Sequence, residues 1–169
     1  VTHLFNAMSQ FGSREPGLVG AALDADRIWV GIIADGTHVH FASVRLSKII
    51  KGRKLILVTD AMPPVGSEAT RFQLGDLQVF VKDGRCVTVD GTLAGSALDM
   101  ATAVRNCVQK VGIPLDEALR MASTYPAELL GIGDQFGRIK PGHLANMVIF
   151  NNQLAVKGII SDGKYLEFG

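Results

Sequence analysis

The chain has 169 residues, of which 47% are hydrophobic and 20% are charged, and its formal net charge is +1. This provides enough apolar material for the core of one domain, or of one domain with an appendage. The balanced charge excludes nucleic acid and anionic membranes as expected partners, and no apolar run is long enough to span a bilayer. Cys86 and Cys107 form no CxxC pair. We therefore expect free thiols and a cytoplasmic location.

The first residue is Val1 and not Met. An apolar stretch follows at once, and we expect the natural chain to begin further upstream.

Three apolar segments separated by helical patterns predict a βαβαβ arrangement in the first part of the chain. Strands are expected at residues 1–5, 28–34 and 55–59, with helices at 18–23 and 39–50 between them. Such units form parallel sheets with right-handed crossovers. Residues 62–70 contain two prolines and a glycine, and are expected to form a loop.

The pattern changes after residue 70. Alternating apolar residues predict antiparallel strands near 72–74, 77–81 and 86–89, with a hairpin turn at Asp83 and Gly84. Ser96 is the expected N-cap of a helix over 97–111, and Pro114 opens a second helix. The tail predicts short strands near 137–139, 145–150 and 156–161, followed by a hairpin.

Polar, potentially reactive residues follow each of the three predicted parallel strands. His3 and Asn6 accompany the first strand, His38 follows the second, and Asp60 follows the third. Parallel strands point their carboxyl ends to one edge, where barrels and doubly wound sheets place their chemistry. Taken singly, Asp60 could as well be a helix N-cap or part of a structural salt bridge as a functional residue. Either His could be a buried structural residue. Three successive strand ends together favour a shared site.

Five motifs carry a resemblance to a known family. They are THLFNAM at residues 2–8, GSREPG at 12–17, ADGTHV at 34–39, VTDA at 58–61 and LAGS at 93–96. Together they resemble the N-acetylglucosamine-6-phosphate deacetylases of the amidohydrolase superfamily. The segment GRIKPGHLAN at 137–146 resembles the closing segment of that superfamily, with Asn146 in place of the usual Asp.

The resemblance implies an α/β fold, namely the C-terminal part of a (β/α)8 TIM barrel plus part of a small β-sandwich domain. Residues 1–70 would form βα units around barrel strands six to eight, and 71–92 a β-sandwich hairpin insertion. Residues 93–136 would form barrel-closing helices, and 137–169 further β-sandwich strands. Family members are more than twice as long, so an N-terminal half carrying the other metal ligands is the implied missing partner.

The resemblance also implies the chemistry. This is metal-dependent hydrolysis of the N-acetyl group of N-acetylglucosamine 6-phosphate, a step of amino-sugar catabolism and cell-wall recycling. His3 matches a metal ligand, the metal being zinc, or iron or another divalent ion. Asp60 matches the catalytic acid–base, which takes a proton from the attacking water and gives it to the leaving amine.

The remaining matched residues concern the substrate. Asn6, Ala7 and Arg14 match the phosphate site, where Arg14 is expected near the interface of a homodimer. His38 matches a residue that contacts a sugar hydroxyl or the phosphate. Leu93, Ala94, Gly95 and Ser96 match residues that line the substrate pocket.

Two alternatives remain open. One is another metal-dependent amidohydrolase acting on a cyclic amide, which would share Asp60 but not the phosphate site. The other is a non-catalytic fragment or binding module.

Overall fold

The centre of the molecule is a pair of parallel strands. In a computed structural model, which describes residues 1–82 and 85–168, β1 (Val30–Ile32) pairs with β2 (Leu55–Leu57). Every residue of both strands is buried, as expected for a parallel sheet covered by helices. Helix α2 (Phe41–Lys51) connects them, which confirms the predicted βαβ unit, although both strands are shorter than expected.

Residues 1–8 lie beside β1 but do not form the predicted strand. The N–H of Gly31 donates to the Val1 carbonyl and the N–H of Leu4 to the Gly31 carbonyl, both at 2.8 Å. His3 and Phe5 have φ angles of 37° and 77°. Left-handed residues interrupt an extended ladder, so this segment becomes a series of turns.

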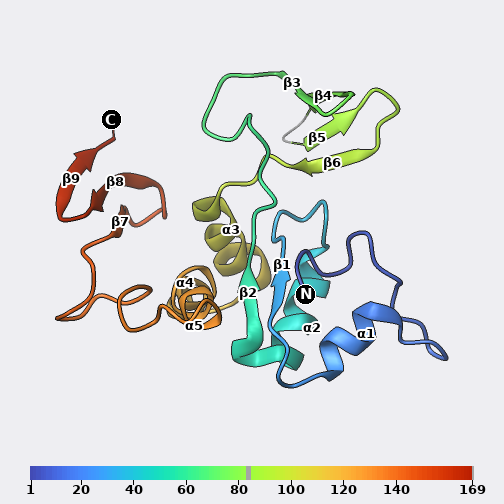
Figure 1. Cartoon of the computed structure of the whole chain (residues 1–169), viewed down its shortest axis with the longest axis horizontal. Coiled ribbons are helices and arrows are strands. Elements are labelled where there is room, and N and C mark those ends of the chain that lie inside the picture. Colours follow the sequence, from blue (N-terminus) through green and yellow to red (C-terminus); the bar gives the residue numbers. More distant parts are fainter. Residues whose placement is uncertain (83–84, 169) are drawn as a thin grey trace.

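Helices surround the parallel pair (Figure 1). Besides α2 they are α1 (Gly17–Asp24), the 3₁₀ turn η1 (Gly52–Lys54), α3 (Met100–Asn106), the π-helical turn η2 (Cys107–Val111), α4 (Leu115–Ala122) and α5 (Thr124–Leu129). The predicted cap at Ser96 is wrong. Asp99 caps α3 by accepting a bond of 2.8 Å from the Thr102 N–H, because the chain stays extended through Ser96.

The core lies between the strands and these helices. Its fully buried side chains come from segments that are far apart in the chain. They include Leu4, Val19, Ile32, Leu55 and Met121. Burying side chains of this size stabilises a fold by about 1.5–3 kcal/mol each. Packing of this kind holds the carboxyl ends of β1 and β2 in fixed positions.

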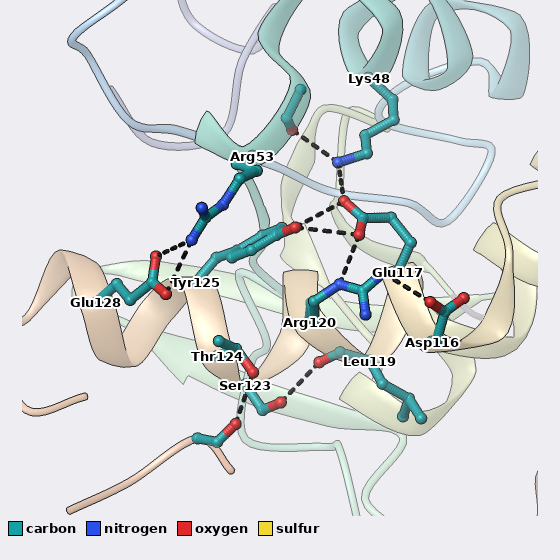
Figure 2. Close-up of polar contacts among 12 residues, drawn as sticks. Lys48, Arg53, Asp116, Glu117, Leu119, Arg120, Ser123, Thr124, Tyr125 and Glu128 are labelled. Atoms are coloured by element: carbon teal, nitrogen blue, oxygen red, sulfur yellow. Dashed lines mark hydrogen bonds and ion pairs between the residues drawn. The ribbon is translucent and has the colours of Figure 1, made fainter. Parts of the chain in front are cut away.

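An ion-pair network joins α2 to α4 and α5 (Figure 2). Lys48 and Arg120 both pair with Glu117, the second pair at 2.7 Å, and the Tyr125 hydroxyl donates to the same carboxylate. Burial opposes ionisation of Glu117, but these hydrogen bonds outweigh it and lower its pKa to about 2. The network fixes the helices behind the sheet.

A four-stranded antiparallel sheet follows β2. It contains β3 (Arg71–Leu74), β4 (Leu77–Lys82), β5 (Arg85–Thr88) and β6 (Leu93–Ser96) in chain order. The predicted strands are confirmed, and β6 extends the sheet beyond the expected boundary at residue 92. The turn predicted at Asp83 and Gly84 lies outside the described residues.

The C-terminal segment forms a separate three-stranded sheet of β7 (Met147–Phe150), β8 (Val156–Ser161) and β9 (Lys164–Glu167). The strand predicted at 137–139 does not form. The Gly137 carbonyl instead accepts a bond of 2.6 Å from the Thr124 hydroxyl, which ties this segment to α5. The two antiparallel sheets lie apart in Figure 1, so they do not form a sandwich with each other.

Within residues 1–82 and 85–168, no helix is both long enough and apolar enough to cross a membrane. Cys86 and Cys107 are buried and unpaired, as predicted. Burial raises the pKa of the Cys107 thiol to about 12, so this cysteine is an inert core residue.

Candidate active site

Two carboxylates lie at the same edge of the parallel pair. Ile32 and Leu57 are register partners, and the Val58 N–H donates to the Ile32 carbonyl at 3.1 Å. Asp35 lies three residues after Ile32, and Asp60 lies three residues after Leu57. The strand ends therefore come together at one edge, as the sequence predicts.

Asp60 has a left-handed backbone, with φ at 51°. Such a conformation in a residue other than glycine is strained and persists only where neighbouring contacts impose it. Here the Ser96 N–H donates to the Asp60 carbonyl, and the Met62 N–H donates to the Ser96 carbonyl, both at 2.9 Å. The Ser96 hydroxyl also donates to the carbonyl of Thr59. Strand β6 thus holds the residue at the end of β2.

The segment Leu93–Ser96 differs in exposure along its length. Leu93 is exposed, Ala94 and Gly95 are half-buried, and Ser96 is buried. The Ser96 hydroxyl is engaged internally, since it also accepts from the Leu98 N–H at 3.1 Å.

Gly95 has φ at 87°, and a Cβ there would lie 2.6 Å from the Met62 Cγ. Only glycine fits this close passage beside Asp60.

His3 is oriented by its own turn. Its Nδ1 lies 3.1 Å from the Asn6 carbonyl oxygen, which can only accept, so Nδ1 carries the proton. Nε2 is then left with a lone pair, which is the usual arrangement of a histidine that binds a metal. Among the described residues, no three His, Cys, Asp or Glu side chains gather into a metal site.

Asn6 and Ala7 complete the turn after His3. The Asn6 side-chain amide donates to the carbonyls of Leu4 and His3 at 3.2 and 3.4 Å, so its donors are used within the turn. Ala7 is exposed and has φ at 52°. Within residues 1–82 and 85–168, the Ala7 N–H donates no hydrogen bond. Turns with alternating left-handed residues can direct backbone N–H groups at anions.

Arg14 lies on an exposed loop, which is closed by a bond of 3.0 Å from the Gly12 N–H to the Glu15 carbonyl. In the part of the chain that the structure describes, the Arg14 guanidinium makes no ion pair.

His38 is nearly enclosed and is paired with Asp35. Its Nδ1 lies 2.6 Å from Oδ2 of Asp35, and the exposed fractions of the two side chains are 5% and 16%. The hydrogen bond to Asp35 raises the pKa of His38 against the opposing effect of burial, and the charge of Asp60 also raises it. Asp35 is not among the site residues predicted from the sequence. Its place in an Asp-Gly turn three residues before His38 was the available signal.

An open pocket of about 300 Å³ lies elsewhere, lined by Val1, Thr2, Trp29, Gly31, Ile56, Val58 and Leu129. The lining comes from β1 and β2, from residues next to them and from the end of α5, and none of it is a predicted site residue. The candidate site is therefore the loop edge and not this pocket.

Known proteins are similar to this chain over nearly its whole length. The amidohydrolase family profile matches residues 1–166. An N-acetylglucosamine-6-phosphate deacetylase of Haemophilus influenzae is 42% identical over an alignment that covers 98% of this chain and 44% of that protein. A putative N-acetylgalactosamine-6-phosphate deacetylase of Escherichia coli K12 is 39% identical, over 98% of this chain and 99% of that protein.

A solved structure is also similar to this chain. The crystal structure of the N-acetylglucosamine-6-phosphate deacetylase of Pasteurella multocida has a TM-score of 0.95 and 45% identity, over 99% of this chain and 44% of its own. The chain thus spans less than half the length of the H. influenzae and P. multocida deacetylases. Since the family profile covers nearly every residue, the chain belongs to the amidohydrolase family.

Proposed function

We propose that this chain supplies part of the active site of a metal-dependent deacetylase of N-acetylglucosamine 6-phosphate. The products would be glucosamine 6-phosphate and acetate. The observation that carries the proposal is Asp60, held in a strained conformation at the carboxyl edge of the sheet, where the paired His38 also lies. Strained residues cluster where function requires them.

Asp60 is the proposed general acid and base. Its carboxylate would accept a proton from the attacking water and deliver it to the departing nitrogen, which leaves poorly until it is protonated. His3 would bind a divalent metal through Nε2, with zinc as our first choice and iron or another divalent ion as alternatives. When bound, the metal would supply Lewis-acid activation of water and of the acetyl carbonyl.

The phosphate would be recognised by the turn and loop that follow His3. The Ala7 N–H and the Arg14 guanidinium are suitable donors, because neither is engaged within the described residues. Asn6 would support this turn, and His38 would contact a sugar hydroxyl or the phosphate. The segment Leu93–Ser96 would line the pocket beside Asp60.

The remaining parts of the proposal concern the assembly. Residues 1–70 would supply strands six to eight of a closed barrel, and the two antiparallel sheets would each supply part of the same small β-sandwich domain. An N-terminal half would supply the other metal ligands. We further propose a homodimer with Arg14 near its interface, in the cytoplasm, where the free thiols of Cys86 and Cys107 would stay reduced.

A second candidate substrate is N-acetylgalactosamine 6-phosphate. The E. coli K12 relative, which is matched over 99% of its length, is named as a putative deacetylase of that sugar phosphate. The two sugars differ only in the configuration of one hydroxyl, and the same acid–base and phosphate groups would serve both.

The test is a chimera of the H. influenzae relative in which this chain replaces the segment that it matches. We expect the folded chimera to release acetate from N-acetylglucosamine 6-phosphate, to lose activity with a chelator, and to prefer the phosphorylated sugar. Activity on cyclic amides without preference for phosphate would favour another amidohydrolase. A chimera that melts cooperatively and hydrolyses none of these amides would contradict the proposal.

A further inference from the structure

The turn between β1 and α2 carries an acid–histidine pair whose acid has no assigned role. Oδ1 of Asp35 accepts hydrogen bonds from the N–H groups of Thr37 and His38, both at 2.8 Å. Oδ2 lies 2.6 Å from Nδ1 of His38. One carboxylate therefore shapes the backbone of the turn and also holds the imidazole.

The position of Asp35 is itself fixed by neighbouring elements. The Asn106 amide donates at 2.9 Å to the carbonyl of Ala34, the residue just before Asp35. Asn106 ends α3, where the helix widens into the π turn η2, a feature often found near functional sites. A Cβ on Gly36 would lie 2.7 Å from the Phe41 ring, so the Phe41 side chain packs closely against the turn at Gly36.

The carboxylate decides which ring nitrogen of His38 is offered to a ligand. A carboxylate accepts, so Nδ1 must carry a proton, and the second nitrogen, Nε2, has no recorded partner within the described residues. Asp35 and Asp60 are the charged groups that act on the imidazole, and both favour its cationic form. In that form Nε2 is also a donor, suited to a hydroxyl or phosphate oxygen.

We propose that Asp35 is a positioning residue, whose carboxylate holds Nδ1–H of His38 so that the cationic imidazole presents a charged Nε2–H donor to the sugar phosphate. The inference rests on the proposed function, since it gives that function a substrate-orienting pair. It assigns Asp35 no contact with substrate. The amino-acid change that isolates it is Asp35→Asn, because Asn keeps an oxygen for the two backbone N–H groups but removes the charge.

The first experiment measures the imidazole directly. Proton–nitrogen NMR spectra of the protein, with the His38 signals assigned by their loss in His38→Gln, distinguish protons on Nδ1 and Nε2. We expect His38 to stay cationic to a higher pH in the wild type than in Asp35→Asn, and its neutral form to move its proton from Nδ1 to Nε2. Identical spectra and titrations in the two proteins would overturn the inference, whether or not any activity is present.

The second experiment measures catalysis in the chimera with N-acetylglucosamine 6-phosphate. Asp35→Asn should raise KM about 5- to 30-fold, as expected when a neutral Nε2–H replaces the charged donor of cationic His38, with a smaller change in kcat. The rise of KM with pH should begin at a lower pH in the variant. In a His38→Ala background, Asp35→Asn should have no further effect on KM.

Asp99→Asn is the matched control. Asp99 also accepts from a nearby backbone N–H and hydroxyl, those of Thr102 at 2.8 and 2.6 Å, but it faces no histidine in these contacts. The Asp99→Asn substitution should leave KM unchanged. An equal KM increase in Asp99→Asn, or an additive effect of Asp35→Asn without His38, would assign Asp35 a purely structural role. An inactive wild-type chimera with the expected NMR difference would contradict the proposed function and not the pairing.

Discussion

The backbone N–H of Ser96 donates a hydrogen bond of 2.9 Å to the carbonyl of Asp60. Ser96 is the last residue of β6, and Asp60 follows β2 of a different sheet, so the bond joins the ends of the two sheets. It imposes the left-handed conformation of Asp60, so the position of the proposed acid–base depends on a buried serine that is distant in sequence.

Ser96→Ala should lower both stability and turnover in the chimera. The Thr59 carbonyl and the Leu98 N–H would each lose a partner, which costs about 1–3 kcal/mol. Turnover should fall more than substrate binding, because Asp60 would be held less firmly. Kinetics and thermal melting check this.

Ser67→Ala is the control for that change. The Ser67 hydroxyl also donates to a carbonyl, that of Pro64 at 3.1 Å, and accepts from the N–H two residues later, that of Ala69. It lies in the loop 62–70, away from these bonds to Asp60. Turnover that falls equally in both variants would remove Ser96 from the positioning of Asp60.

Asp60→Asn should leave folding and substrate binding nearly unchanged but remove most turnover. General acid–base groups contribute about 10²- to 10⁴-fold in rate. Single-turnover assays of the chimera, with binding measured separately, check this. A variant that keeps more than about a tenth of wild-type turnover would exclude Asp60 as the acid–base.

Arg14→Ala should raise KM for the phosphorylated sugar while changing activity on unphosphorylated N-acetylglucosamine little. A charge-assisted contact with phosphate is worth about 1.5–3 kcal/mol, or roughly 10- to 150-fold in KM. Steady-state kinetics with both sugars give the comparison. Equal losses on both would mean that Arg14 supports the loop and not the phosphate.

The network around Glu117 should make stability depend on acidic pH. Its pKa is lowered from 4.5 to about 2, so the ionised carboxylate stabilises the folded state above the unfolded pKa. That contribution should be lost progressively as the pH falls from about 4.5 towards 2. Glu117→Gln should flatten the fall of the unfolding free energy with pH over this window, as measured by denaturant titrations.

Glu128→Gln is the comparison for that experiment. Glu128 pairs with Arg53 at 3.0 Å and Arg138 at 2.9 Å, but 66% and 49% of these arginine side chains are exposed. Exposed pairs contribute little, so its effect should be the smaller one. A larger effect of Glu128→Gln would contradict the importance assigned to the Glu117 network.

The sequence by itself determined the local elements and the edge where the candidate site lies. Continuous apolar runs bounded by Gly and polar residues allow a buried parallel strand, as in 55–57, and alternating patterns specify antiparallel strands such as Val156–Ser161. The ends of parallel strands must meet at one edge, and this placed Asp60 near the residues that follow β1.

Only the tertiary structure decided how those residues are held. Neither periodicity nor spacing indicates that β6 reaches Asp60, so the sequence pattern predicts a helix cap at Ser96, where the structure has a strand. The left-handed turns at His3 and Phe5 likewise follow from contacts with β1, and they replaced a predicted strand. Local sequence patterns encode burial and backbone preference, whereas hydrogen bonds between residues far apart in the chain form only once the elements have packed.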